Sequence, residues 1–288
     1  MKELVVISGK GGTGKTSLTA AFASLAKNKI ICDADVDAAD LHLILHPKIK
    51  KCTDFKAGHS AIINTEMCSA CGTCRELCQW DAINKSFSVD PIRCEGCGVC
   101  VYFCPEKAIN FPEKTSGQWF ISDTRLGPMV HAALGIAEEN SGKLVSLVRQ
   151  EAKKLADEKK KDLIVTDGPP GIGCPVIATV GGANAVIIVT EPTVSGVHDM
   201  ERVSELARFF KVPAMVCVNK ADINPEKTEE IAEFAMENGL KYLGEIPFDP
   251  VFTQSMVNGQ TIFEYDSVSN TSKAVKNVWE NVAEEIGI

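Results

Sequence analysis

Residues 4–16 read LVVISGKGGTGKT, an apolar run that passes directly into a glycine-rich loop. The run Leu4–Ser8 has the Val/Ile content of a buried strand, and the residues after the loop have a helical pattern. Residues 9–16 match G-x-x-x-x-G-K-[ST], a loop whose backbone N–H groups surround phosphate oxygens at a helix N-terminus. We therefore expect Lys15 to reach the β- and γ-phosphates of a nucleotide, and the Thr16 hydroxyl to bind Mg²⁺.

Most of the chain alternates between strand-like and helical stretches. The expected strands are Leu4–Ser8, Lys29–Cys32, Trp119–Ser122, Leu163–Thr166, Ala185–Thr190, Ala214–Asn219 and Tyr242–Ile246. The expected helices are Thr16–Lys27, Lys143–Lys159, Met200–Phe210, Pro225–Asn238 and Thr271–Ile286. Several strands are continuous apolar runs, as is typical of parallel strands covered on both faces. The pattern predicts an α/β fold with a doubly wound, mostly parallel sheet.

A cysteine-rich repeat interrupts this alternation. Residues 67–84 read MCSACGTCRELCQWDAIN and residues 93–110 read RCEGCGVCVYFCPEKAIN, with 8 of 18 aligned positions identical. The repeat predicts a small inserted α+β domain at residues 63–112, which divides the α/β domain into residues 1–62 and 113–288. A unit of this size needs a metal or a disulfide to hold it together. No signal segment precedes the first strand, so the clustered cysteines favour metal binding over disulfides.

Each repeat has the spacing C-x2-C-x2-C-x3-C, which resembles that of a bacterial two-cluster ferredoxin. In that arrangement the fourth cysteine of each repeat binds the other cluster. The resemblance implies two [4Fe–4S] clusters, the first held by Cys68, Cys71, Cys74 and Cys104, and the second by Cys94, Cys97, Cys100 and Cys78. Structural zinc is the alternative, but zinc sites usually separate their two C-x2-C pairs by a longer loop.

The phosphate loop also resembles the deviant Walker A loop of the MinD/ParA class of P-loop ATPases, which is related to the nitrogenase iron protein and to Mrp-type cluster carriers. Three segments carry the resemblance: KGGTGKT at residues 10–16, DADVD at 33–37 and LIVTDGPPG at 163–171. It implies four catalytic residues: Lys10, which reaches the partner subunit's nucleotide; Lys15; Asp35, which orients the attacking water; and Asp167, which holds Mg²⁺ together with Thr16.

The same resemblance extends the nucleotide site to the second half of the chain. It places Gly171 against the γ-phosphate, and it places the segments at 219–220 and 244–249 beside the base. The complete expected set is Gly9, Lys10, Gly11, Gly12, Thr13, Gly14, Lys15, Thr16, Ser17, Gly171, Asn219, Lys220, Pro247 and Asp249. Residues 219–222 also spell N-K-x-D, a guanine-reading motif in which Asp222 would accept from the base. We favour ATP over GTP because the class uses ATP.

Cys174 follows Asp167 by seven residues, at the offset of a cluster ligand in the nitrogenase iron protein. We expect it to be a thiol whose environment depends on the bound nucleotide, with a redox role or a labile cluster. Burial as an ordinary core thiol is the alternative.

The net charge and the length of the apolar runs argue against two classes of partner, nucleic acids and membranes. The chain has 38 acidic and 30 basic residues and a net charge of -8, so it has no basic footprint for nucleic acid or an anionic membrane. No apolar run approaches the ~18 residues of a membrane span. We therefore expect a cytoplasmic protein with neither a nucleic-acid nor a membrane partner.

Together these features predict an iron–sulfur ATPase (a hydrolase) that uses ATP/ADP and Mg²⁺ and forms an ATP-dependent homodimer. Its output would be electron transfer to a redox partner, or Fe–S or metal cluster assembly on a metallocluster partner. The alternative is a positioning ATPase of the MinD/ParA type in which the clusters are structural or sensory.

Overall fold

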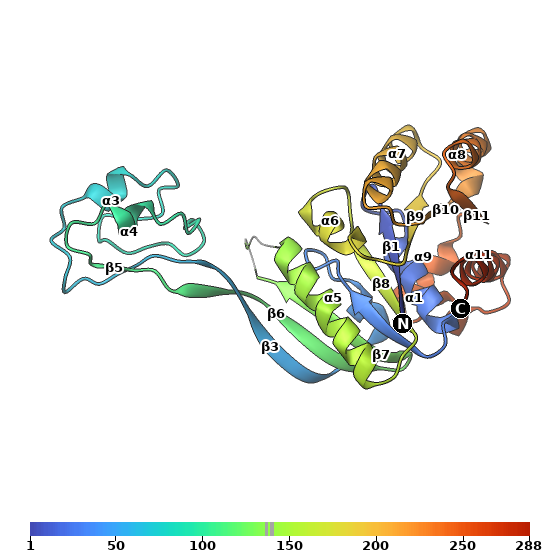
Figure 1. The fold of residues 1–288 in the computed structure, drawn as a ribbon, viewed down its shortest axis with the longest axis horizontal. Coiled ribbons are helices and arrows are strands. Elements are labelled where there is room, and N and C mark those ends of the chain that lie inside the picture. The colour runs from blue at the N-terminus through green and yellow to red at the C-terminus, as the bar shows by residue number, and fades with distance from the viewer. Residues whose placement is uncertain (136–137, 139–140) are drawn as a thin grey trace. The chain divides into compact units, whose positions relative to one another are not determined.

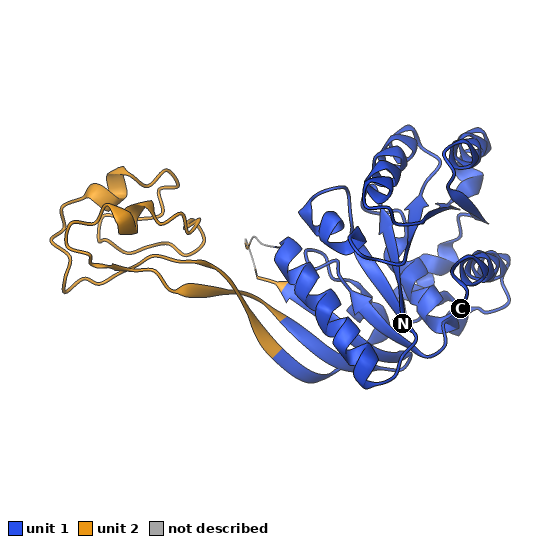
Figure 2. Cartoon of the chain, viewed as in Figure 1, with its two compact units in different colours: residues 1–52, 119–133, 141–288 blue, residues 53–118, 134–140 orange. Residues whose placement is uncertain are grey.

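The computed structural model describes residues 1–135, 138 and 141–288. The chain forms two compact units (Figure 2). Unit 1 comprises residues 1–52, 119–133 and 141–288, and unit 2 comprises residues 53–118 with the described residues of 134–140. The predicted insertion at residues 63–112 falls inside unit 2.

A nine-stranded sheet organises unit 1, in the order β11-β10-β9-β1-β8-β2-β7-β6-β3. The strands from β11 to β7 pair in parallel, which confirms the predicted mostly parallel α/β sheet. The strand bounds are β1 Lys2–Ser8, β2 Lys29–Asp33, β3 Lys48–His59, β6 Glu113–Thr124, β7 Gly127–Leu134, β8 Leu163–Pro170, β9 Ala185–Thr190, β10 Ala214–Asn219 and β11 Lys241–Ile246.

Helices cover both faces of this sheet (Figure 1), as the doubly wound prediction requires. Alternate residues of β1 enter different cores: Leu4 and Val6 pack toward α1 and α11, whereas Val5 and Ile7 pack toward α6, α7 and α8. The helices of unit 1 are α1 Lys15–Leu25, α2 Leu41–Leu45, α5 Ser141–Glu158, α6 Cys174–Val180, α7 Val194–Phe209, α8 Pro225–Glu237, α9 Pro250–Val257, α10 Ile262–Tyr265 and α11 Asn270–Ile286, with a 3₁₀ turn at Ala221–Ile223. None of the described helices has the length and apolar composition of a membrane span.

Several elements differ from the sequence-based expectation, and strand β7 and helices α2, α6, α9 and α10 were not predicted. Helix α7 begins six residues before the predicted Met200, because the Thr193 side chain caps it by accepting a hydrogen bond from the Gly196 N–H at 3.0 Å. Strand β6 extends the predicted Trp119–Ser122 in both directions. Strand β3 was not predicted, because most of its side chains are exposed and polar.

Unit 2 has little regular structure of its own. Strand β4 (Ile62–Ile63) pairs antiparallel with β5 (Ile109–Asn110), and two single-turn helices, α3 (Thr73–Glu76) and α4 (Val99–Tyr102), lie between them in the chain. The buried cluster of this unit consists of Ala61, Cys74, Ile83 and Ile109, and partly buried cysteines pack against it. Apolar burial on this scale is small for an independently folding unit.

Candidate functional site

The glycine-rich loop joins β1 to α1, and residues from a distant strand brace it. Gly14 precedes α1 with a φ of 85°, a conformation that favours glycine. A Cβ at this position would lie 2.4 Å from Asn219 Nδ2. The Asn219 side-chain amide donates a hydrogen bond to the Thr13 carbonyl at 2.8 Å. The end of β10 therefore fixes the loop in place, and glycine is required at position 14 to allow the approach.

Lys15 is buried at the centre of the loop and pairs with two aspartates. Its Nζ lies 3.2 Å from Asp35 Oδ2 and 2.9 Å from Asp167 Oδ1, and the Thr19 hydroxyl donates to the same Asp167 oxygen at 3.0 Å. Burial by itself lowers the pKa of Lys15, but the charges of Asp167 and Asp35 outweigh burial and raise it. Three segments that are far apart in the sequence thus meet at one ammonium group.

The cluster contains three buried aspartates, Asp33, Asp35 and Asp167, but a single lysine to balance their charge. Asp33 lies close by, and burial, reinforced by the charge of Asp167, raises its pKa well above the usual value. Burial also raises the pKa of Asp35. Asp33 Oδ2 and Asp167 Oδ2 are buried without a hydrogen-bond partner in the described part of the chain. Hard oxygen ligands and excess negative charge fit a divalent cation such as Mg²⁺.

Lys10 is held by its own chain, beside the loop. Its Nζ lies 3.2 Å from Glu191 Oε2 and within 3.2 Å of the hydroxyl oxygens of Thr193 and Ser195. Glu191 also pairs with Lys220, whose ammonium donates to the Gly12 carbonyl at 3.1 Å. One carboxylate therefore holds two of the predicted nucleotide-binding lysines.

An open cavity of about 1100 Å³ lies over the loop. Twelve of the predicted nucleotide-site and catalytic residues line it: Gly11, Gly12, Thr13, Gly14, Lys15, Thr16, Ser17, Asp35, Asn219, Lys220, Pro247 and Asp249. Gly9, Lys10, Asp167 and Gly171 are not in the lining. Asp167 reaches the site through Lys15, and the Gly171 N–H donates to the Ser8 carbonyl at 2.9 Å.

The cavity has a wall that the motifs did not indicate. Phe252, Thr253 and Met256 of α9 line it, next to Phe248 of the segment already expected beside the base. Helix α9 begins where Asp249 accepts a hydrogen bond from the Val251 N–H at 2.9 Å, with proline at its first position. An aspartate followed by proline is a recognisable helix start, so this signal was available in the sequence.

The N-K-x-D segment does not form a guanine-reading site in this structure. Asp222 Oδ1 accepts a hydrogen bond from the Phe248 N–H at 2.6 Å, and Asp222 is not part of the cavity lining. Asn219 and Lys220 bind loop carbonyls, as described above. The segment thus braces the phosphate loop and the loop after β11.

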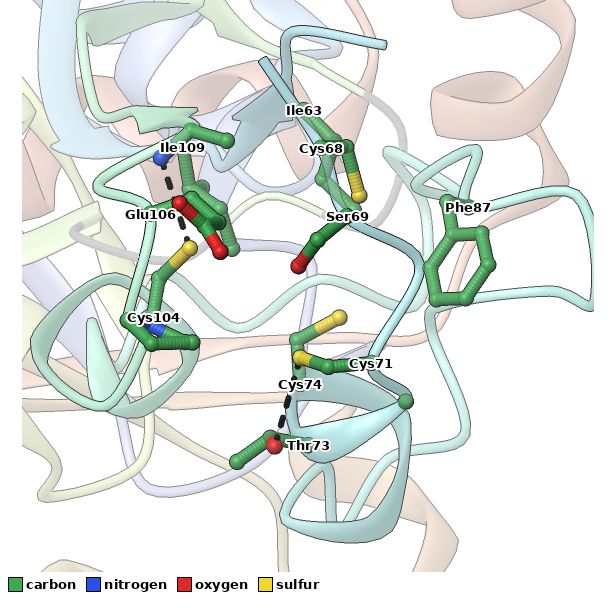
Figure 3. Close-up of a pocket in the computed structure, with 13 residues that line it drawn as sticks. Ile63, Cys68, Ser69, Cys71, Thr73, Cys74, Phe87, Cys104, Glu106 and Ile109 are labelled. Atoms are coloured by element: carbon green, nitrogen blue, oxygen red, sulfur yellow. Dashed lines mark hydrogen bonds between the residues drawn. The ribbon is translucent and has the colours of Figure 1, made fainter.

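In unit 2, the eight clustered cysteines line two separate cavities. Cys68, Cys71, Cys74 and Cys104 line one, and Figure 3 shows these four side chains around a common space. Cys78, Cys94, Cys97 and Cys100 line the other. The two sets are those that the ferredoxin resemblance implies.

Hydrogen bonds reach several of these sulfur atoms. The Ala108 N–H donates to Cys104 Sγ at 3.3 Å, and the Ala82 N–H donates to Cys78 Sγ at 3.4 Å. Cys71 Sγ lies 3.4 Å from the Thr73 hydroxyl, and this hydrogen bond lowers the pKa of the Cys71 thiol. Among the described residues, no three His, Cys, Asp or Glu side chains converge to hold a single metal ion. The cavities therefore show no preformed metal-binding group among the described residues.

Cys174 is exposed at the first position of α6, so the alternative of a buried core thiol is wrong. A Cβ placed on Gly142 of α5 would lie 3.4 Å from Cys174 Cβ, so the start of α5 packs against it closely. Cys174 lies in neither cysteine-lined cavity.

Comparison with known proteins places the fold and the loop in context. The family described as the CobQ/CobB/MinD/ParA nucleotide binding domain matches residues 4–262. An uncharacterised protein of Methanocaldococcus jannaschii is 35% identical over 99% of this chain and 97% of its own length. The septum site-determining protein MinD of Synechocystis is 25% identical over 96% of this chain and 86% of its own length. The structure of Pyrococcus horikoshii MinD complexed with Mg-ADP superposes with a TM-score of 0.61 at 18% identity, covering 99% of this chain and 97% of the other, which shows a shared P-loop NTPase fold.

Proposed function

The chain belongs to the CobQ/CobB/MinD/ParA family of nucleotide-binding domains, and on this premise we propose that it is an ATPase whose nucleotide state acts on two [4Fe–4S] clusters in unit 2. The family includes the MinD/ParA ATPases. The observation that carries the cluster part of the proposal is the division of the eight cysteines into two cavities of four, in the sets that the ferredoxin spacing implies.

The nucleotide chemistry follows from the Lys15 cluster. When ATP enters the cavity, the ammonium of Lys15 transfers from Asp35 and Asp167 to the β- and γ-phosphates. Thr16 and Asp167 would hold Mg²⁺, whose charge would neutralise the carboxylates that lost Lys15. Asp35 is left free to accept a proton from, and orient, the attacking water. The Gly171 N–H, now bonded to Ser8, exchanges this partner for the γ-phosphate.

Dimerisation is proposed to depend on Lys10. For Lys10 to reach the partner subunit's nucleotide, it must leave Glu191, Thr193 and Ser195. The triphosphate carries more negative charge than Glu191 and than the diphosphate of ADP, so the exchange is most favourable when ATP lies across the interface. Lys220 remains with Glu191, which keeps that carboxylate neutralised after Lys10 departs.

What supports clusters in unit 2 is the donor set of each cavity, four cysteines with one backbone N–H that donates to a sulfur atom. A bound [4Fe–4S] cluster supplies one-electron transfer at low potential. The Ala82 and Ala108 N–H groups, which donate to Cys78 and Cys104, would stabilise the thiolate charge. The proposed output is electron delivery to, or cluster assembly on, a partner protein, with Cys174 as a thiol that responds to nucleotide.

A positioning ATPase is the second candidate, and the comparisons favour it over electron transfer. The supporting observation is the match to the septum site-determining protein MinD along 96% of this chain. In that function the clusters, if bound, would be structural or would sense the redox state, and the working output would be the ATP-dependent dimer.

Anaerobic purification tests the proposal. We expect close to eight iron atoms and eight sulfides per chain. We also expect a visible charge-transfer band that bleaches on reduction. Zinc without sulfide contradicts the cluster part of the proposal.

ATP-dependent dimerisation, measured by light scattering, should be lost in Lys10→Ala. Lys50→Ala, at an exposed lysine, is the matched control and should still dimerise. To separate the candidates, ATP turnover is compared with and without reduction of the clusters. A rate that does not respond to reduction, with no transfer of electrons or clusters, supports the positioning function.

A further inference from the structure

The two cysteine cavities are related by the internal repeat, which makes them a natural comparison of two sites within one chain. A shift of 26 positions carries Cys68, Cys71 and Cys74 onto Cys94, Cys97 and Cys100. The backbone donors obey the same relation, because Ala82 and Ala108 are equivalent and their N–H groups lie 3.4 and 3.3 Å from the sulfurs of Cys78 and Cys104. Helices α3 and α4 are also equivalent and both begin after a glycine of positive φ.

One polar contact breaks this symmetry. In the first cavity the Thr73 hydroxyl lies 3.4 Å from Cys71 Sγ (Figure 3). The equivalent residue beside Cys97 is Val99, which lines the second cavity with an aliphatic side chain. Thr73 and Val99 occupy the same position at the start of their helices, and the two side chains have nearly the same shape. The difference between the sites at this position is therefore a single hydroxyl group.

The remaining lining is apolar in both cavities, with Phe87 and Ile109 in the first and Trp80 and Phe111 in the second. The first cavity also includes a second hydroxyl, from Ser69. Hydrogen bonds to the sulfurs of a cluster stabilise its more negative, reduced state and so raise its reduction potential, whereas an apolar environment lowers it.

We propose that Thr73 gives the cluster held by Cys68, Cys71, Cys74 and Cys104 the more positive reduction potential of the two. The cluster in the first cavity would then be the one that is reduced when the chain holds one electron. The inference rests on the proposed function, because it requires both clusters. Once Cys71 is a thiolate ligand it has no proton to donate, and the Thr73 hydroxyl becomes the donor. The Val99 side chain cannot take this role.

A direction of electron flow within unit 2 follows. With both clusters bound, an electron from a low-potential one-electron donor would distribute according to the two potentials. Cys68, Cys71 and Cys74 would then hold the reduced cluster beside Thr73, and Cys94, Cys97 and Cys100 would hold the oxidised one. No bond is made or broken in this step, and no proton moves. At one electron per chain, the reduced cluster is the one beside Thr73.

The experiment exchanges the hydroxyl between the two sites in the cluster-loaded full chain. Anaerobic redox titration with dithionite, followed by electron paramagnetic resonance, should give two midpoint potentials in the wild type. Thr73→Val should shift the more positive midpoint to a more negative value, and Val99→Thr should shift the more negative midpoint to a more positive value. Thr73→Ser retains the hydroxyl and should keep the wild-type order, which a purely structural role of the side chain does not predict.

Iron and sulfide analysis accompanies each titration. Full loading with unchanged midpoints in both Thr73→Val and Val99→Thr overturns the inference while leaving the proposed clusters in place. Absence of clusters from the wild type overturns both the inference and the proposed function. If Thr73→Val does not load, Val99→Thr decides: no rise in the lower midpoint overturns the inference.

Discussion

The nucleotide site and the cysteine cavities are held in place by different means. Around Lys15 the polypeptide itself supplies the positioning: β1, β2, β8 and β10 end beside one loop, and their side chains already contact one another. In the described part of unit 2, the buried cluster around the cysteines consists of Ala61, Cys74, Ile83 and Ile109, and four cysteine side chains line each of two cavities. The first site is organised by the sheet before any ligand binds, whereas the second depends on what its cysteines bind.

Removal of the clusters should have the largest effect. When an iron chelator strips the purified protein, we expect residues 53–118 to lose their resistance to limited proteolysis, because so small a core cannot offset the entropy of ordering the unit. Nucleotide binding by unit 1 should persist, as measured by fluorescence with a labelled nucleotide. Equal protease resistance before and after stripping would show that unit 2 folds without metal and would remove the contrast.

Substitution of Lys15 is the corresponding test of unit 1. In metal-free buffer, Lys15→Ala should lower the free energy of unfolding by about 3–5 kcal/mol, because it leaves Asp33, Asp35 and Asp167 buried without a counter-charge. Nucleotide binding should be lost as well.

Lys50→Ala is the control for that measurement. Lys50 pairs with Asp123 at 3.5 Å with both side chains exposed, so its loss should cost below about 0.5 kcal/mol in a denaturant titration. If Lys15→Ala were as stable as this control, the site would not be preorganised by the ion pairs.

Acid should weaken unit 1 through His131, which hydrogen-bonds Ser122 at 2.9 Å between β7 and β6. Burial, aided by nearby His42, lowers the pKa of His131 to about 4. The folded protein therefore favours the neutral ring, and its stabilising effect is complete above pH 6.5 and is lost as the pH falls toward 4. The loss is at most about 3 kcal/mol at pH 4.

Denaturant titrations at several pH values check this window. His131→Gln keeps a hydrogen-bonding group for Ser122 but does not titrate, so its stability should vary less than that of the wild type between pH 6.5 and 4.5. The Arg125 side chain lowers the pKa of Glu264 to about 2, so that pair contributes to acid sensitivity mainly below pH 4.5. Identical pH profiles for the two proteins would assign the acid sensitivity to other groups.

Asp222 should give the smallest effect. Asp222→Ala removes the hydrogen bond to the Phe248 N–H, an exposed backbone group that water then satisfies, so we expect a loss of ATP affinity of up to about fivefold, or ~1 kcal/mol. The preference for ATP over GTP should persist, as measured by competition binding. A wild-type preference for GTP that disappears in Asp222→Ala would instead assign the carboxylate to the base.

Local sequence predicted the buried parallel strands most accurately. The bounds of β9 and β10 agree with the expected Ala185–Thr190 and Ala214–Asn219, because a continuous run of Val, Ile and Met between polar residues has few other ways to be buried. Strands β3 and β7 were missed. Exposed lysines occupy much of β3, and β7 begins with Gly-Pro, so the strand conformation of both depends on pairing with β6 rather than on their own composition.

The amino-acid sequence by itself determined those features of the site that lie within a short segment: the phosphate loop at residues 9–16, and the repeated C-x2-C-x2-C-x3-C spacing of the cysteines. The division of the cysteines between two sites was implied by the ferredoxin resemblance. Only the tertiary structure decided which distant groups meet: Lys10 and Lys220 on Glu191, Asp222 on the Phe248 backbone, and α9 over the loop. The spacing of residues in the sequence predicts contacts only between residues of the same turn or the same helix. Contacts between different strand ends, such as Lys10 with Glu191, depend on the strand order, and no local pattern encodes that order.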